Sequence, residues 1–238
     1  MSNGVDVSYE ASGAARAVVT ADIARIMPIP EVAGVAAVTS LLLALARHDG
    51  RTYMHSLGVG CRAWQLMIAL GGTAEQARQS GLAGLLHDVG KINVPRSVVQ
   101  KSGSLTTEEW AMIRFHPLEG ARLVRLYPEI ASLAPIIAAQ YERPDGLGYP
   151  AGRHLADILD AALVLAVADA AEAMASWRPY AAPMSADEIR EELRAGAGTC
   201  WGYAAAMMAA QECTHPVEQR RAHWTVQPLL EPRIAVAG

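Results

Sequence analysis

The sequence predicts an all-α fold, and three observations lead to this prediction. Apolar side chains recur at helical spacing along most of the chain. Two capping boxes, Thr73 with Gln76 and Thr106 with Glu109, mark the starts of helices. No alternating apolar and polar pattern is long enough to indicate a strand. With 238 residues and 52% hydrophobic side chains, the chain can bury one full core.

Composition excludes several classes of protein. The 20 basic and 24 acidic residues give a net charge of −4 without a dense Lys/Arg block, so a bulk nucleic-acid partner is not expected. The longest apolar run, 32–46, contains Gly, Thr and Ser and is too short to cross a bilayer, so no membrane segment is expected. The 3 cysteines form no CxxC pair and the N-terminus shows no signal peptide, which together predict reduced thiols and a cytoplasmic location.

The chain is expected to have three parts. Residues 1–35 form an N-terminal extension with one helix over 14–27, which Pro28-Ile29-Pro30 ends because proline lacks the amide N–H. Residues 36–212 form the helical domain. Residues 213–238 contain prolines and mixed charge, and they are expected to form an irregular C-terminal tail.

The first helices of the domain lead to its most informative stretch. A helix over 36–47 precedes one that begins near His55, and Gly71-Gly72 ends the second of these. The helix that Thr73 opens is expected to end at His87-Asp88. These two side chains therefore lie where a helix meets a loop.

The rest of the domain is also expected to be helical. A loop over 90–103 leads to the helix opened by Thr106, and His116-Pro117 is expected to close that helix. The remaining helices are expected at 117–126, 130–141, 158–176, 186–195 and 201–212.

Three pieces of the sequence carry side chains that suit a metal site: His55, His87-Asp88 and Asp169. Asp169 stands in an apolar helix, where an ionised carboxylate is unfavourable unless it is paired or bound to a metal. Two imidazoles and two carboxylates suit a divalent first-row metal, with iron, manganese, cobalt, nickel and zinc all open. Such a metal would acidify a bound water to give a nucleophile, and Lys91 would neutralise a phosphate oxygen. A single His–Asp pair also fits a hydrogen-bonded cap, but the three pieces together favour the metal.

These motifs resemble the HD superfamily of metal-dependent phosphohydrolases and, within it, the HD-GYP branch. The resemblance extends over roughly residues 40 to 200. It rests on His55, His87-Asp88-Val89-Gly90-Lys91-Ile92, His116-Pro117-Leu118-Glu119-Gly120-Ala121, Asp145-Gly146-Leu147-Gly148-Tyr149-Pro150, Val167-Ala168-Asp169 and Arg178-Pro179-Tyr180.

The resemblance implies an HD-type helical bundle with a central metal site and, in active members, hydrolysis of cyclic di-GMP or a related cyclic dinucleotide. One or two divalent transition-metal ions are expected, with iron or manganese favoured. The implied metal ligands are His55, His87, Asp88, His116 and Asp169. Asp88 and Lys91 are the implied catalytic residues. The implied substrate contacts are Lys91 and Arg178 at the phosphate, and Asp145 and Tyr149 in the loop at the entrance.

The chain departs from the family pattern at one set of metal ligands. Gln140-Tyr141-Glu142 stands where the family usually has His-His-Glu, so two ligand histidines are absent. A second metal is left with Asp88 and His116 as its recognisable ligands. Tyr141 is expected to contact substrate as a hydrogen-bond donor to a phosphate, with relaxed selection for a ligand as the alternative.

Three further departures are smaller. Arg51, four residues before His55, replaces a glutamate that binds metal in some members, Ala181 replaces a basic residue, and Glu172 replaces a common aspartate. Two metals clamp both the attacking and the leaving oxygen in phosphoester hydrolysis. Loss of the second set is therefore expected to weaken this chemistry more than the loss of a remote contact.

Three functions remain open from the sequence. The first is a metal-dependent phosphodiesterase acting on a cyclic dinucleotide or another phosphoester. The second is a non-catalytic domain of the same fold that binds a nucleotide or a protein partner, which the substitutions at Gln140, Tyr141 and Ala181 suggest. The third is an iron oxygenase, against which the missing histidines argue. A homodimer is also left open.

Overall fold

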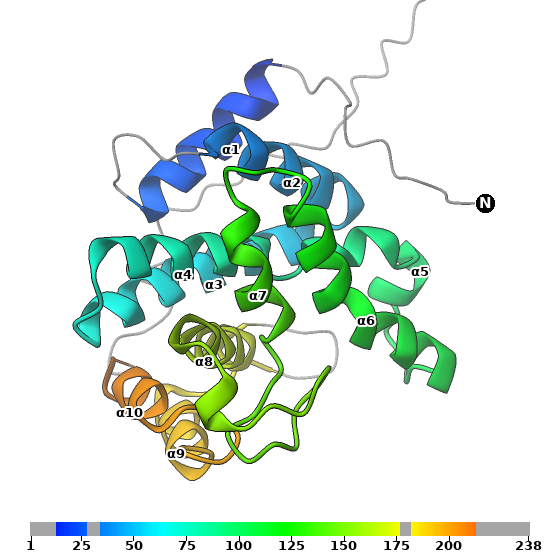
Figure 1. Ribbon diagram of the computed structural model, residues 1–238. Coiled ribbons are helices and arrows are strands. Elements are labelled where there is room, and N and C mark those ends of the chain that lie inside the picture. The colour runs from blue at the N-terminus through cyan, green and yellow to red at the C-terminus, as the bar shows by residue number, and fades with distance from the viewer. Residues whose placement is uncertain (1–12, 28–33, 177–181, 213–238) are drawn as a thin grey trace, which may run out of the picture.

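The computed structural model describes residues 13–27, 34–176 and 182–212, so Arg178, Ala181 and the tail lie outside the described residues (Figure 1). In the described ranges the chain forms helices and no strand, with two isolated bridges. The all-α prediction is therefore confirmed. The elements are α1 (Gly13–Ile26), α2 (Val35–His48), α3 (Gly50–Ala69), α4 (Ala74–Leu86), η1 (Val89–Asn93), α5 (Arg96–Val99), α6 (Thr107–Val124), η2 (Ala131–Leu133), α7 (Ala134–Ala138), η3 (Leu155–Asp157), α8 (Asp160–Ala175), α9 (Ala186–Ala195) and α10 (Tyr203–Glu212).

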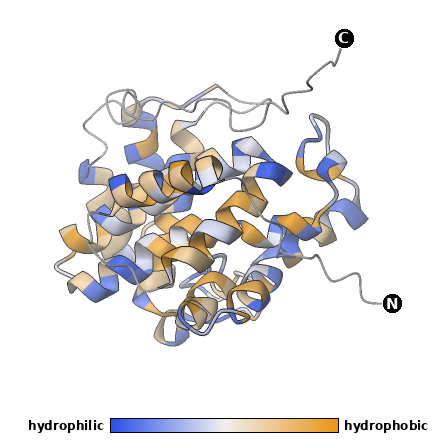
Figure 2. Cartoon of the chain, turned by 90° about the horizontal axis from the view of Figure 1, so that it is seen from above, coloured by the Kyte–Doolittle hydropathy of each residue, from blue (hydrophilic) through white to orange (hydrophobic). Residues whose placement is uncertain are grey.

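Helices α3 and α4 form the centre of the bundle (Figure 1). Leu57 and Leu66 of α3 and Leu82 of α4 are fully buried, and apolar stretches mark the central helices in Figure 2. The two backbones touch at glycines, because a Cβ on Gly84 would lie only 2.7 Å from the Cα of Gly60. This close approach brings the start of α3 and the end of α4 to the same region of the interior.

Helix α1 belongs to the same core. Val19, Ile23 and Met27 are buried and pack within the single large apolar cluster of the described residues. The Tyr53 hydroxyl of α3 donates a hydrogen bond to Asp22 of α1 at 2.9 Å. The helix expected in the N-terminal extension therefore packs directly on the bundle. No helix in the described ranges combines the length and apolar character that a membrane span requires.

The predicted helix starts at Thr73 and Thr106 are confirmed. In each case the threonine side chain accepts a hydrogen bond from the backbone N–H three residues on, and the side chain of Gln76 or Glu109 accepts one from the threonine N–H. These reciprocal bonds satisfy two of the amides that a helix start leaves unpaired. Helix α4, which ends beside His87, therefore has a fixed beginning.

The prediction that His116-Pro117 closes a helix is wrong. Helix α6 continues through Pro117 to Val124. Proline cannot donate to the carbonyl four residues earlier, that of Ile113. The His116 ring nitrogen Nδ1 lies 2.5 Å from this carbonyl oxygen and takes the place of the missing donor. The side chain of the preceding residue thus allows the helix to pass the proline.

The expected loop over 90–103 also contains regular structure. A 3-10 turn, η1, directly follows Asp88, and the short helix α5 begins after Pro95. Both are shorter than the window over which apolar periodicity can be recognised. The helix expected over 130–141 is likewise shorter and consists of η2 and α7.

Helix α3 carries His55, and its N-terminus depends on Asp49. The Asp49 carboxylate accepts hydrogen bonds from the Thr52 backbone and hydroxyl at 2.9 and 2.7 Å and from Gln100 at 3.1 Å. Burial alone would raise the pKa of Asp49, but the hydrogen bonds from Thr52 and Gln100 outweigh it and lower the pKa. The ionised form is therefore the one that caps the helix.

We expect Asp49→Ala to lower the free energy of unfolding by about 1–2 kcal/mol at pH 7, as for other helix caps. Because the folded-state pKa of Asp49 is lowered, its contribution is present above the unfolded-state pKa of about 4 and is lost as the pH falls. The difference between variant and wild type should therefore shrink in urea unfolding at pH 3. The exposed Asp157→Ala is the control. An undiminished difference at pH 3 would contradict the role of the ionised cap.

Candidate metal centre

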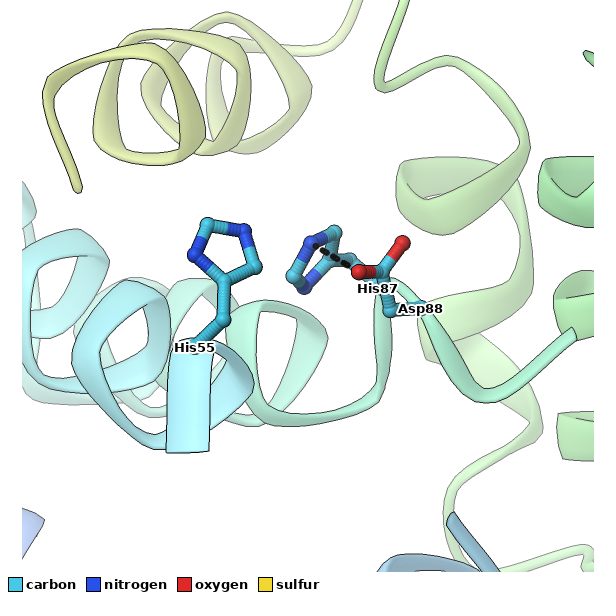
Figure 3. Close-up of side chains that lie close together, drawn as sticks. All are labelled: His55, His87 and Asp88. Carbon is cyan, nitrogen blue, oxygen red and sulfur yellow. Dashed lines mark ion pairs between the residues drawn. The ribbon is translucent and has the colours of Figure 1, made fainter. Parts of the chain in front are cut away.

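Four segments of the bundle meet at the candidate metal centre. His55 comes from α3, His87 and Asp88 follow α4 directly, His116 comes from α6 and Asp169 from α8. Figure 3 shows His55 reaching toward His87, with Asp88 on the other side of His87. The ligand atoms of His55, His87 and Asp88 all lie within 4.8 Å of one another. The structure thus brings together residues that are far apart in the sequence.

Asp169 completes this group from the opposite side. Its Oδ1 lies 2.9 Å from His55 Nε2 and 3.8 Å from His87 Nε2. Asp88 Oδ2 lies 3.4 Å from His87 Nε2, and its Oδ1 lies 3.1 Å from His116 Nε2. All five sequence-predicted metal ligands therefore lie around one small volume of the interior.

The orientation of two imidazoles is fixed by their own helices. His87 Nδ1 lies 2.8 Å from the carbonyl oxygen of Gly84, and His116 Nδ1 lies 2.5 Å from that of Ile113. A carbonyl can only accept, so each Nδ1 carries a proton, and Nε2 is the ring atom left to bind a metal ion. This arrangement is typical of histidines that bind metals through Nε2.

Several polar atoms at the centre are buried without a hydrogen-bond partner among the described residues: His87 Nε2, His116 Nε2 and Asp88 Oδ1. The residues that carry them are at most 2% exposed. Buried polar atoms in folded proteins are nearly always satisfied. Nitrogen lone pairs and a carboxylate oxygen that face one another are stabilised when a cation lies between them. The residues present therefore fit a divalent metal ion.

The charges at the centre favour the ionised carboxylates. Burial alone would raise the pKa of Asp88, but the charges of His87 and Lys91 outweigh it and hold the pKa well below its usual range. Burial is likewise outweighed at Asp169, where the hydrogen bond from His55 and the charge of His87 lower the pKa. The pKa of His87 is raised, because Asp88 outweighs the opposing effect of burial. Both carboxylates are therefore anionic ligands at neutral pH.

Lys91 lies at the edge of the centre. Its Nζ donates a hydrogen bond to Asp88 Oδ2 at 2.7 Å, and its side chain is 20% exposed. The 3-10 turn η1 places this ammonium group between the buried carboxylate and the surface. It is therefore positioned next to any ligand that enters from the solvent side.

The sequence-predicted substrate contacts have different surroundings. The Tyr141 hydroxyl donates to Asp169 Oδ2 at 3.3 Å. The Tyr149 ring stacks on the Tyr141 ring with centroids 4.9 Å apart and planes 17° apart. Asp145 accepts hydrogen bonds from Arg143 and from the Leu147 backbone, and these bonds hold the local turn. Tyr141 and Tyr149 thus lie beside the centre, whereas Asp145 shapes the loop around it.

Two supporting residues were not predicted as site residues. The Arg114 guanidinium of α6 lies 4.4 Å from the centroid of the Tyr149 ring and makes a cation–π contact with it. Glu142 is buried, and its two carboxylate oxygens accept hydrogen bonds from the backbone amides of Ala151 and Arg153 at 2.7 Å each. Glu142 therefore holds the Gly-Tyr-Pro loop in place. Its position before the glycine-rich loop was the available signal, whereas nothing in the sequence marks Arg114.

Close backbone packing supports the position of His116. A Cβ on Gly90 would lie 2.0 Å from the carbonyl oxygen of His116 and 2.5 Å from the amide nitrogen of Gly120. Only glycine allows η1 and α6 to approach this closely. The backbone that follows Asp88 thereby sets the distance between the Asp88 and His116 side chains.

Comparison with known proteins identifies the family. The family model for the HD domain matches residues 40–202. The chain therefore belongs to the HD domain family, whose members bind a divalent metal. The matched range lies within residues 36–212, the expected helical domain, and includes all five candidate ligands.

Three curated relatives act on cyclic dinucleotides by name. The cyclic di-GMP phosphodiesterase PA4108 of Pseudomonas aeruginosa is 41% identical over 144 residues, which cover 58% of this chain and 34% of that protein. A cyclic di-GMP phosphodiesterase of Thermotoga maritima is 34% identical over 152 residues (63% and 41%). The 3'3'-cGAMP-specific phosphodiesterase 1 of Vibrio cholerae is 30% identical over 143 residues (60% and 33%). The match thus spans well under half the length of each relative.

A solved structure shares the fold. Bd1817, an HDG"Y"P protein from Bdellovibrio bacteriovorus, aligns with a TM-score of 0.59 over 88% of this chain and 76% of that one, at 17% identity. Together with the family match and the curated relatives, this places the chain in the HD-GYP branch. The fold is an HD-type helical bundle, as the sequence predicted.

Proposed function

We propose that the chain is a metal-dependent phosphodiesterase that hydrolyses a cyclic dinucleotide. The observation that carries this proposal is the buried group of unpaired donor atoms on His87, Asp88 and His116, which faces His55 and Asp169. The names of the curated relatives support cyclic di-GMP and 3'3'-cGAMP as the substrate class. Fold alone does not define an activity, so the donor group is the stronger support.

The proposed roles follow from the geometry. His55, His87, Asp88 and Asp169 would hold the ion, and iron or manganese suits their nitrogen and oxygen donors. A divalent ion held by these residues would lower the pKa of a water molecule and so supply a nucleophile at neutral pH. Lys91, whose ammonium group contacts Asp88 at the edge of the centre, is placed to bind a phosphate oxygen of the substrate. The Tyr149 loop, which Glu142 holds, would border the substrate.

The test is hydrolysis by the purified chain after loading with Mn²⁺ or Fe²⁺. Cyclic di-GMP, 3'3'-cGAMP and bis(p-nitrophenyl) phosphate serve as substrates, and metal-free protein prepared with a chelator is the control. We expect turnover of at least one cyclic dinucleotide that requires the metal. Binding of a cyclic dinucleotide without turnover would instead favour the non-catalytic role that Gln140 and Tyr141 suggest. Absence of turnover with every metal and substrate would overturn the proposal.

A further inference from the structure

We propose that Tyr141 limits the metal centre to one divalent ion and orients Asp169 as a ligand of that ion, an inference that rests on the proposed metal centre. Tyr141 is thereby a positioning residue rather than a substrate contact. The proposal rests on the positions of the possible metal-binding atoms, which form two groups near the Tyr141 side chain.

The donor atoms form two unequal groups. The first contains His55 Nε2, His87 Nε2, Asp88 Oδ2 and Asp169 Oδ1, with the distances from the two histidines to the carboxylates between 2.9 and 3.8 Å. Among the five predicted ligands, the second contains Asp88 Oδ1 and His116 Nε2, which lie 3.1 Å apart. The first group offers four protein donors to an ion, and the second offers two.

Tyr141 lies beside the second group. Its ring meets the His116 ring edge to face, with centroids 5.7 Å apart and an interplanar angle of 79°. Its hydroxyl does not face His116 but donates to Asp169 Oδ2 at 3.3 Å. Well-held catalytic ions usually have three protein ligands. With two donors from the predicted ligands, the second group falls short of this number, and the Tyr141 ring beside His116 adds no donor atom to it.

The neighbouring residues hold Tyr141 in this position. The Tyr149 ring lies nearly parallel to the Tyr141 ring, 4.9 Å away, and Arg114 covers the Tyr149 ring at 4.4 Å. Rotation of Tyr141 away from the centre would separate the stacked rings and leave buried surface unfilled. The amide nitrogen of Gln140, the preceding residue, donates to the backbone carbonyls of His87 and Ile137, which fixes this side chain beside Tyr141.

The same hydroxyl defines how Asp169 binds. It engages Oδ2, so Oδ1 is left facing His55 and His87. An outer hydrogen bond of this kind orients a ligand carboxylate, and its removal commonly lowers metal affinity 10–100-fold. Tyr141 therefore has two separable parts: a ring that fills the second position and a hydroxyl that orients Asp169.

The test measures metal content and affinity as well as turnover. The wild-type chain, Tyr141→Phe and Tyr141→His are loaded with Mn²⁺ and freed of excess metal. The metal is then counted by elemental analysis, and electron paramagnetic resonance distinguishes isolated from coupled Mn²⁺ ions. We expect one isolated ion in the wild type, one ion bound roughly 10–100-fold more weakly in Tyr141→Phe, and two coupled ions in Tyr141→His. Tyr203→Phe, at an exposed tyrosine, should bind as the wild type does.

Each outcome bears on a separate part of the inference. Two ions in the wild-type chain would overturn it, and so would a single ion in a folded Tyr141→His variant. Unchanged affinity in Tyr141→Phe, which keeps the shape of the ring, would overturn the role of the hydroxyl. One ion without any hydrolysis would support the inference and count against the proposed phosphodiesterase. A wild-type chain that binds no ion would overturn both.

Discussion

Asparagine in place of Asp88 is expected to lower the rate of phosphodiester hydrolysis by roughly 10³-fold or more and to remove the bound metal. The side chain is 1% exposed: Oδ2 lies 2.7 Å from Lys91 Nζ, and Oδ1 lies 3.1 Å from His116 Nε2, the atom with which it would share an ion. Asparagine has the same shape but lacks the charge, and its NH₂ group cannot bind a cation. A bound ion supplies several kcal/mol of transition-state stabilisation, and each ~1.4 kcal/mol is a factor of ten in rate.

The measurements for Asp88→Asn are turnover and metal content of the same preparation, with circular dichroism to show that the helices are retained. The exposed Asp157→Asn makes the same chemical change on the surface and should leave both quantities unchanged. A variant that retains its metal and more than about a tenth of the wild-type rate would show that Asp88 is not a ligand.

Alanine in place of Gly90 is expected to destabilise the protein by about 3 kcal/mol, at the upper end of the usual range for overpacking. The added Cβ would lie 2.0 Å from the carbonyl oxygen of His116. This obstacle is backbone inside a helix and not the end of a flexible side chain. Helix α6 must therefore move away from η1, which would also withdraw His116 from Asp88.

Urea unfolding of Gly90→Ala against wild type checks this prediction. Gly103 provides a matched control, because a Cβ at that position meets nothing within 4 Å. Gly103→Ala should change the free energy of unfolding by no more than about 0.5 kcal/mol. Similar stability in the two variants would mean that η1 and α6 can separate at little cost.

Local signals in the sequence were sufficient to predict many of the helices. The capping boxes at Thr73 and Thr106 depend on residues three apart, so they can be recognised without the fold. The effect of Pro117 on its helix could not be predicted from a local pattern of this kind. A proline normally ends a helix, and here the outcome depended on the His116 side chain reaching a carbonyl on its own helix. The propensity of one residue was overridden by a hydrogen bond from its neighbour.

The metal ligands could be predicted from the sequence, whereas the side chains that orient them could not. Asp169 could be singled out because a carboxylate in an apolar helix needs a partner. Its partners, His55 and Tyr141, lie 114 and 28 residues away in the chain. The direction of the Tyr141 hydroxyl depends on stacking with Tyr149, from a loop whose position Glu142 fixes. Such orientation results from packing between distant segments, and no local pattern encodes it.

The placement of His87 and Asp88 directly after α4 has an electrostatic consequence. The aligned peptide dipoles of a helix give its C-terminal end a partial negative charge. Helix α4 ends at Leu86, so the Asp88 carboxylate lies where this field disfavours an anion. A divalent cation bound there would make the net charge at the helix end positive, so the helix dipole would attract the ion as its ligands do. The end of α4 thereby makes ion binding and the stability of the folded bundle mutually reinforcing.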